Sequence, residues 1–251
     1  MTTPPVALVT GATQGIGRAI AERLSADGYR VGVNGRCEDQ QMTDVVAAVG
    51  GFAAPADVSD PAAVSAAVAA AEQRHGPISV LVCNAAYMSM GPVTEHDEND
   101  WWKVVDTNLG GTFHTIQAVL PGMRRLGGGR IVVIASEWGV TGWPRATAYA
   151  ASKAGLIALT KTLGRELARE NIVVNAVAPG VTDTPQLEVD AADAGVDLAE
   201  MHRRYAEDIP VGRIGRPAEI ADAVALLTSP FAGSFIGQTI QINGGTTRCR
   251  V

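Results

Sequence analysis

The sequence predicts a single α/β domain, a doubly wound parallel sheet of about seven strands with helices on both faces. Short apolar runs alternate with helical stretches along most of the chain, which is the pattern of successive strand–helix–strand units. Runs such as IVVIA at 131–135 and IVVNAV at 172–177 are almost continuously apolar. Strands have this composition when helices cover both faces of their sheet.

The positions of the elements follow from these runs and from the helical periodicity between them. Strands are expected at residues 5–10, 30–34, 52–55, 79–83, 130–135, 172–177 and 239–242, and helices near residues 15–27, 38–48, 61–75, 100–125, 147–170 and 217–228. Residues 181–210 interrupt the alternation, because they are acidic and poor in strand signals. Such a stretch is expected to be a lid or a solvated helical excursion. No linker or repeat divides residues 1–251, so one domain is expected.

Composition excludes several classes of function. The net charge is −6 and the pI is near 5.2, so the electrostatic footprint of a nucleic-acid-binding protein is absent. Cys37, Cys83 and Cys249 are too few and too scattered for a disulfide framework or a zinc site, and no metal is expected. No signal peptide or apolar run of about 20 residues is seen, so the sequence predicts a cytoplasmic protein without a membrane partner.

A glycine-rich turn follows the first expected strand. VALV at 6–9 leads into TGATQGIG at 10–17 and then into a helical stretch. In such a unit Gly11 permits a sharp turn, Gly15 lets a pyrophosphate approach the backbone, and Gly17 lets the helix pack closely on the strand. The helix start offers free N–H groups to an anion. This arrangement predicts a dinucleotide site.

A second signal is YAASK, in which Tyr149 and Lys153 stand four residues apart, thirteen after Ser136. On a helix, positions i and i+4 share a face, so the phenol and the ammonium are expected to point into one space. A nearby ammonium lowers a phenol pKa from its usual value of about 10. Tyr149 is therefore expected to exchange a proton with an alcohol or carbonyl oxygen.

Together these residues resemble the classical branch of the short-chain dehydrogenase/reductase family. The resemblance covers nearly the whole chain, from about Val6 to Gly245, and implies a Rossmann-type fold with hydride transfer to or from NAD(P). The matching motifs, in chain order, are TGATQGIG at 10–17, Asp57, NAA at 84–86, Asn108, Ser136, Tyr149, Lys153 and PG at 179–180.

The resemblance implies catalytic roles for four of these residues. Tyr149 is the expected proton donor in reduction, and Lys153 lowers its pKa and binds the nicotinamide ribose. Ser136 is expected to donate a hydrogen bond to the same substrate oxygen. Asn108 is expected to anchor a water that links Lys153 to solvent.

The cofactor is expected to be NADP(H) rather than NAD(H). Where relatives that use NAD carry an acid after the second strand, this chain has Gly35, and Arg36 follows it. A guanidinium can hold the 2′-phosphate through charge-assisted hydrogen bonds. Nearby Glu38 and Asp39 weigh against this interpretation, and so does Gln14, which replaces the basic residue of many NADP-dependent relatives. A surface arginine without a ligand is the alternative.

The other residues that the resemblance assigns to the cofactor lie in loops after the expected strands. They are Gly11, Thr13, Gln14, Gly15, Ile16, Gly17, Asp57, Val58, Asn84, Ala85, Pro179, Gly180, Thr182 and Thr184, together with Tyr149 and Lys153. For Asp57 the alternative role is a cap-like turn residue before the helix at Pro61. CNAA departs from the family's NNAG turn, because Cys83 replaces its first asparagine and Ala86 its glycine.

The leading functional hypothesis is NADPH-dependent reduction of a ketone to a secondary alcohol. The segments GRIGRPAEIADAVALL and GQTIQINGG resemble 3-oxoacyl-thioester reductases. A dehydrogenase of a sugar, polyol or secondary alcohol is the alternative, and a dinucleotide-sensing module without turnover is the alternative from another class. A carrier-protein substrate requires a basic docking patch, for which Arg124, Arg125 and Arg130 are the candidates.

The pocket and the assembly are less constrained. The resemblance implies a lid at about 181–210 and a homotetramer or homodimer that packs through the helices near 100–125 and 147–170. Residues near the catalytic positions suggest a mostly apolar cleft. The candidates are Met88, Met90, Glu137, Trp138 and Trp143, with His96 and His202 as weaker ones.

Overall fold

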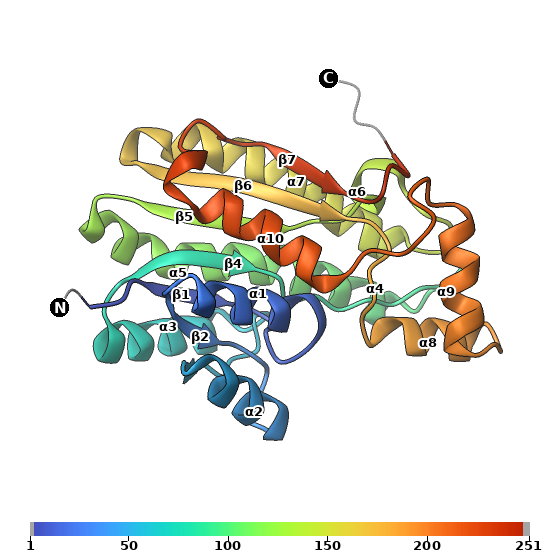
Figure 1. Ribbon diagram of the computed structural model, residues 1–251, viewed down its shortest axis with the longest axis horizontal. Helices are drawn as coiled ribbons and strands as arrows, with labels where there is room; N and C mark the ends of the chain where they lie inside the picture. Colours follow the sequence, from blue (N-terminus) through green and yellow to red (C-terminus); the bar gives the residue numbers. More distant parts are fainter. Residues whose placement is uncertain (1–2, 248–251) are drawn as a thin grey trace.

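The computed structural model describes residues 3–247, and its strands form one all-parallel sheet (Figure 1). The strand order is β3-β2-β1-β4-β5-β6-β7, so the chain reverses direction of winding beside β1, as the predicted doubly wound fold requires. The strands are β1 (Val6–Val9), β2 (Arg30–Val33), β3 (Phe52–Ala53), β4 (Ile78–Cys83), β5 (Gly129–Ile134), β6 (Ile172–Pro179) and β7 (Thr239–Ile242). Cys249 and the last residues of the TTRCRV tail lie outside the described residues.

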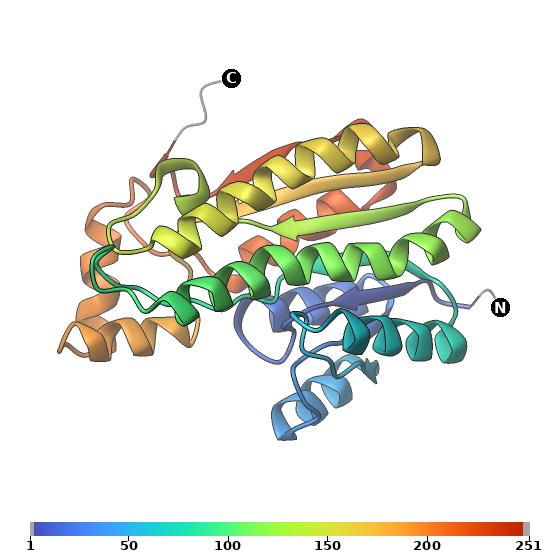
Figure 2. The ribbon, with the colours of Figure 1, turned by 180° about the vertical axis from the view of Figure 1, so that it is seen from behind.

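Helices cover both faces of this sheet, as predicted. One face carries α1 (Gly15–Ala26), α2 (Gln40–Val49) and α10 (Pro217–Thr228), with a core between them. The other face carries α3 (Pro61–His75), α5 (Gly111–Leu126) and α7 (Thr147–Leu167), which stand in front in Figure 2. Because both faces are covered, the buried strands carry apolar residues at consecutive positions, and all eight residues of β6 are buried.

The helix expected near 100–125 is a continuous helical segment that contains one π-helical turn. It comprises α4 (Glu98–Val105), a π-helical turn (Asp106–Gly110) and α5. Single π turns within helices are often found at functional sites. This turn contains Asn108, one of the predicted catalytic residues.

Residues 181–210 form two helices that the sequence pattern did not place, α8 (Gln186–Asp193) and α9 (Leu198–Glu207). They pack mainly on each other at the end of the molecule where the strands finish, drawn in orange in Figure 1. Asp197 caps α9 by accepting a hydrogen bond from the Glu200 N–H at 2.8 Å. A further short helix, α6 (Trp138–Thr141), follows β5, and no helix among residues 3–247 is long and apolar enough to cross a membrane.

Candidate active site

The glycine-rich turn after β1 is tied to the turn after β4. The Thr10 hydroxyl accepts hydrogen bonds from the backbone N–H groups of Asn84 (2.9 Å) and Ala85 (3.0 Å). The Asn84 amide donates in return to the carbonyls of Thr10 (3.0 Å) and Gly11 (2.9 Å). Two of the predicted cofactor residues, Asn84 and Ala85, therefore lie beside the glycine turn and hold its shape.

The start of α1 is open to an anion. Its N-cap residue, Gln14, makes no side-chain capping bond, and the first turn has no acidic residue. Gly11 and Gly15 have φ angles of 59° and 53°, in the left-handed region that favours glycine. A Cβ atom on Gly17 would lie 2.1 Å from the Gly11 carbonyl oxygen, so only glycine fits there. Free N–H groups and a closely packed turn suit the pyrophosphate of a dinucleotide.

Asn34 is a structural residue of this region that the sequence analysis missed. Its buried amide donates to the carbonyls of Ala54 (2.9 Å) and Ala56 (3.1 Å), and its oxygen lies 3.4 Å from the Gly11 nitrogen. It therefore joins the ends of three strands beneath the glycine turn. The available signal was a polar residue directly after the apolar strand VGV.

The position next to Arg36 has no room for an acidic side chain. A Cβ atom on Gly35 would lie 2.9 Å from Cγ2 of Thr13. Arg36 itself is exposed, and it is close enough to Asp57 for its charge to act on that carboxylate. Hydrogen bonds from Ser59, and to a smaller extent the Arg36 guanidinium, hold the pKa of Asp57 below its ordinary value. These residues fit a 2′-phosphate, since a cation is present and the competing acid is absent.

The structure shows the turn part of the alternative role considered for Asp57, whereas another residue caps the following helix. Asp57 forms a turn by accepting from the Ser59 N–H (2.9 Å) and hydroxyl (2.7 Å), but the cap of α3 is Asp60. Pro61 occupies the first helical position, which places Asp60 at the N-cap. The side chain of Val58 is buried against Gly111, so only its backbone is suited to contact a cofactor.

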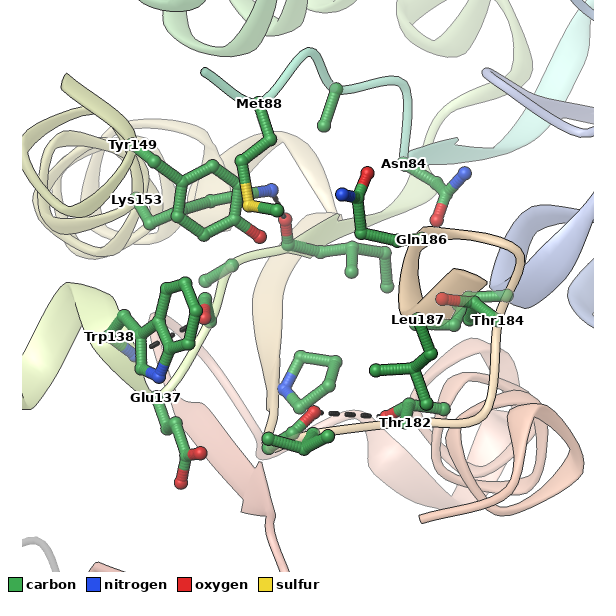
Figure 3. Close-up of a pocket in the computed structure, with 18 of the residues that line it drawn as sticks. Asn84, Met88, Glu137, Trp138, Tyr149, Lys153, Thr182, Thr184, Gln186 and Leu187 are labelled. Atoms are coloured by element: carbon green, nitrogen blue, oxygen red, sulfur yellow. Dashed lines mark hydrogen bonds between the residues drawn. The ribbon is translucent and has the colours of Figure 1, made fainter. Parts of the chain in front are cut away.

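The predicted catalytic side chains of Ser136, Tyr149 and Lys153 border one cavity. Ser136 follows β5 directly, and the other two lie on one face of α7, where they project side by side (Figure 3). The spacing of four residues therefore places Tyr149 and Lys153 on the same face of α7, as expected.

The electrostatics differ from the expectation that Lys153 lowers the pKa of Tyr149. Burial raises the pKa of the Tyr149 phenol to about 12, against a smaller lowering effect of the Ser136 hydrogen bond. The Lys153 ammonium instead donates to the Ile134 carbonyl at 2.7 Å and lies 5.5 Å from the centre of the Tyr149 ring. Burial lowers the pKa of Lys153 to about 8.

Asn108 lies apart from these three groups. Its amide donates to the Tyr87 carbonyl and to the Ser152 hydroxyl, both at 3.1 Å, and its oxygen accepts from the Tyr87 N–H at 2.8 Å. Ser152 in turn donates to the Tyr149 carbonyl at 2.8 Å. The side chain of Asn108 therefore connects the turn after β4 to α7, and these bonds use its amide and its oxygen on groups other than Lys153.

The cavity at these residues has a volume of about 210 Å³ and runs from the start of α1 to α8 and α9. Of the candidates for its lining, Met88, Glu137 and Trp138 border it, whereas Trp143 stacks on Trp138. The predicted nicotinamide segment supplies Pro179, Gly180, Thr182 and Thr184 to its wall. Residues of the segment 181–210 that the sequence analysis did not name also border it, and they are Val181, Gln186, Leu187, Asp190 and Tyr205.

Glu137 borders the cavity, but its carboxyl points away from Tyr149 (Figure 3). The side chain is 5% exposed, and its Oε2 atom has no hydrogen-bond partner in the described part of the chain. Burial raises the pKa of this carboxyl, and a hydrogen bond with Asn243 acts in the opposite direction. Glu137 therefore belongs to the packing between the segment after β5 and the end of β7.

The three arginines considered for carrier-protein docking lie far from Ser136 within this chain. Arg130 is at the start of β5, and Ser136 follows the other end, about 20 Å away at the rise of a β-strand. Arg124 and Arg125, at the end of α5, pair with Glu170 and Glu72. Figure 1 shows that the N-terminal ends of the strands lie at the opposite end of the molecule from α8 and α9.

The histidine candidates also lie outside the cavity lining. His96 lies 3.1 Å from the Ser89 hydroxyl, and His202 lies 3.5 Å from the Asp183 carboxylate. Within residues 3–247, no group of three or more His, Cys, Asp or Glu side chains is arranged to hold a metal ion.

Comparison with known proteins gives consistent results. A family model described as enoyl-(acyl carrier protein) reductase matches residues 11–247. The chain is 41% identical to a putative ketoacyl reductase of Streptomyces coelicolor, over 96% of both proteins. It is 40% identical to the 3-oxoacyl-[acyl-carrier-protein] reductase FabG of Staphylococcus aureus, over 95% of this chain and 96% of that protein.

A solved structure shows the same fold. The crystal structure of a single-residue variant of the actinorhodin polyketide ketoreductase with NADPH is similar, with a TM-score of 0.92 and 40% sequence identity. The match covers 98% of this chain and 99% of that one. Because the motifs, the strand order and the relatives agree over nearly the full length, this chain belongs to the short-chain dehydrogenase/reductase family of oxidoreductases.

Proposed function

We propose that the protein reduces a ketone to a secondary alcohol with NADPH, and that Tyr149 delivers the proton to the carbonyl oxygen. The observation that carries this proposal is the meeting of Ser136, Tyr149 and Lys153 in a cavity that reaches the open start of α1. The relatives support it, since they are named as ketoacyl reductases or as a polyketide ketoreductase with NADPH. When bound, NADPH supplies the hydride, and the side chains supply orientation and the proton.

The protonation state of Tyr149 favours reduction. With a pKa of about 12, the phenol is protonated at neutral pH and is able to donate. Ser136, which borders the same cavity as Tyr149, is placed to share the same carbonyl oxygen and to stabilise the charge that develops on it. The Lys153 ammonium, whose pKa is about 8, is charged at neutral pH and adds a positive potential behind the phenol. In this proposal Asn108 positions α7 rather than touching substrate.

The adenosine end of the cofactor is assigned to Arg36 and Asp57. We expect Arg36→Ala to raise the KM for NADPH by about 10- to 100-fold, the worth of a hydrogen bond between charged groups, and to leave the KM for NADH within about twofold. Initial rates with each cofactor measure this. Arg124→Ala is the matched control, because Arg124 pairs with Glu170 near the N-terminal ends of β5 and β6, away from the cofactor residues. Equal losses for both cofactors would show that Arg36 does not recognise the 2′-phosphate.

Residues 181–210 are proposed as the lid over the substrate, and their charge favours an untethered ketone. The segment contains eight carboxylates and two arginines. Both arginines, Arg203 and Arg204, are paired with glutamates of the same helix. Carrier proteins that deliver acyl groups are acidic, so a surface of this charge repels them. A small neutral ketone meets no such barrier.

Assembly into a homotetramer or homodimer is also proposed. Exposed aromatic side chains on α4 and α5 support it, since Trp102 and Phe113 are each about half exposed. Light scattering coupled to gel filtration measures the mass directly, and a monomer at micromolar concentration would contradict the proposal. A cytoplasmic location stays a prediction from the sequence.

The proposed function is tested by NADPH oxidation at the nicotinamide absorbance band with a panel of carbonyl compounds. The panel holds a 3-oxoacyl thioester, an aryl ketone, a cyclic diketone and a keto-sugar, and the matching alcohols are run in reverse. Reduction of at least one ketone with NADPH is expected. Turnover of sugars or simple alcohols alone would support the dehydrogenase alternative, and no turnover of any compound would contradict the proposal.

A further inference from the structure

Two stacked tryptophans border the cavity beside Tyr149. The rings of Trp138 and Trp143 lie 5.0 Å apart between centroids and within 4° of parallel. Trp138 stands at 80° to the Tyr149 ring, with their centroids 5.8 Å apart. Trp138 borders the cavity and Trp143 covers one of the faces of its ring, so the pair forms a continuous aromatic surface next to the proposed proton donor. We call Trp138 and Trp143 the indole pair.

The backbone holds the indole pair against the catalytic helix. The short helix α6 presses on α7 so closely that a Cβ atom on Gly139 would lie 2.7 Å from the Lys153 carbonyl carbon. The backbone N–H of Trp138 also donates a hydrogen bond to the Ser136 hydroxyl at 3.2 Å. Gly142 directly precedes Trp143 and has a φ of 70°, which favours glycine, and the Trp143 ring stacks on that of Trp138. The position of Trp138 is therefore fixed relative to Ser136 and Lys153.

This placement constrains the part of the substrate next to the carbonyl. A ketone whose oxygen reaches the Tyr149 hydroxyl would occupy the cavity that Trp138 also borders, and the centroids of the Trp138 and Tyr149 rings are 5.8 Å apart. Aromatic rings prefer offset-stacked or edge-to-face partners at such distances. Met88 borders the same cavity near Tyr149 (Figure 3), and thioether sulfur also packs favourably on aromatic rings. Apolar lid residues such as Leu187 border it as well.

The chemistry of reduction agrees with a flat substrate. Hydride reaches a carbonyl carbon from one face of the carbonyl plane. In a ketone conjugated with a ring, that plane is also the plane of the ring, so the opposite face is free to lie on a protein surface. A linear acyl chain has no such face and gains only ordinary apolar contact from an indole.

We propose that the indole pair is a specificity-determining surface that selects a ketone attached to a flat aromatic ring. This inference rests on the proposed ketone reduction and deepens it, because it names the class of substrate. Trp138 makes the contact, and Trp143 supports its position by stacking.

The test compares acetophenone with cyclohexyl methyl ketone, which differ only in the saturation of the ring. For each protein the ratio of the two kcat/KM values is measured with NADPH, so that effects common to both ketones cancel. We expect Trp138→Ala to lower the ratio by about three- to tenfold, the worth of an aromatic pair, and Trp138→Phe to restore most of it. Trp102→Ala removes an exposed tryptophan outside this cavity and is expected to keep the wild-type ratio.

A binding measurement separates this inference from the proposed function. Calorimetric titration with 2-naphthol, which has no ketone, is expected to show weaker binding to Trp138→Ala than to the wild type or Trp102→Ala. An unchanged ratio in Trp138→Ala, or equal binding of 2-naphthol, would overturn the inference while ketone reduction stands. If the wild type reduces another ketone of the panel but neither of these two, the inference is overturned while the proposed function stands. If it reduces no compound of the panel, the proposed function fails and the titration alone decides whether the indole pair binds flat rings.

Discussion

The two sides of the cavity are built in different ways. On one side, Ser136 and Lys153 are buried at the end of β5 and on α7, and their polar atoms form hydrogen bonds with main-chain groups. On the other side, the lid helices α8 and α9 pack mainly on each other, and the arginines of α9 form exposed pairs within that helix. Exposed pairs contribute little to stability, whereas a buried group is held by everything packed around it. The difference indicates that the side of the cavity with Ser136 and Lys153 is held more firmly than the side formed by α8 and α9.

Replacing the phenol on the buried side is expected to have the largest effect. Tyr149→Phe removes only the hydroxyl, so the fold is kept while kcat falls by about 10²- to 10⁴-fold, the usual contribution of a general acid. Steady-state kinetics with the best ketone of the panel measure the loss, and circular dichroism checks the fold. Activity close to that of the wild type would mean that another group donates the proton.

Hydrogen exchange should show the same contrast without any substitution. Amides of β5 and α7 are expected to exchange at least about 100-fold more slowly than those of α8 and α9, because segments with few buried contacts open locally at low free energy. Peptide-resolved exchange by mass spectrometry makes the comparison within one sample. Equal protection of both regions would show that the lid is as firmly packed as the catalytic side.

The buried ammonium is expected to lower the stability of the fold. Burial lowers the pKa of Lys153 from 10.5 to about 8, so keeping it charged at pH 7 costs roughly 3 kcal/mol. Lys153→Met should therefore raise the free energy of unfolding at pH 7 by up to that amount while turnover is lost. The unfolded state binds the extra proton between pH 8 and 10.5, so the gain should shrink as pH rises through that range.

Urea unfolding of Lys153→Met and wild type at pH 7 and at pH 10.5 measures this effect. Lys161→Met, which lies on the same helix but is exposed, controls for the loss of a charge. A stability difference that does not change with pH would show that the ammonium is not responsible.

The smallest effect is expected on the lid. Tyr205 borders the cavity, and its hydroxyl lies 3.3 Å from the Asp190 carboxylate. Tyr205→Phe removes one partly exposed hydrogen bond, so KM should change by no more than about fivefold and kcat by less than about threefold. The same substitution at Tyr149 is the matched comparison. A loss at Tyr205 as large as that at Tyr149 would remove the distinction between the two sides.

The order of the strands and of the helices on the two faces of the sheet was predictable from the sequence, and so was the shared face of Tyr149 and Lys153. Burial on both faces imposes apolar runs on β5 and β6, and the spacing of Tyr149 and Lys153 imposes a shared face on α7. The open start of α1 follows from its glycines in the same way. Each of these properties is local, because it depends on residues within one or two turns of the chain.

Properties that join distant segments were not predictable in this way. Sequence spacing did not indicate that the Lys153 ammonium donates a hydrogen bond to the Ile134 carbonyl. It also did not indicate that Arg130 lies at the N-terminal end of β5, away from the cavity. The same holds for the stacking of the indole pair and for the contact of Tyr205 with the cavity.

The sequence by itself therefore determined the family, the fold and the groups available for proton transfer. The tertiary structure decided the surroundings of those groups and the surface that meets the substrate. Burial sets the pKa values of Tyr149 and Lys153, and burial depends on which segments pack over a side chain rather than on its neighbours in the sequence.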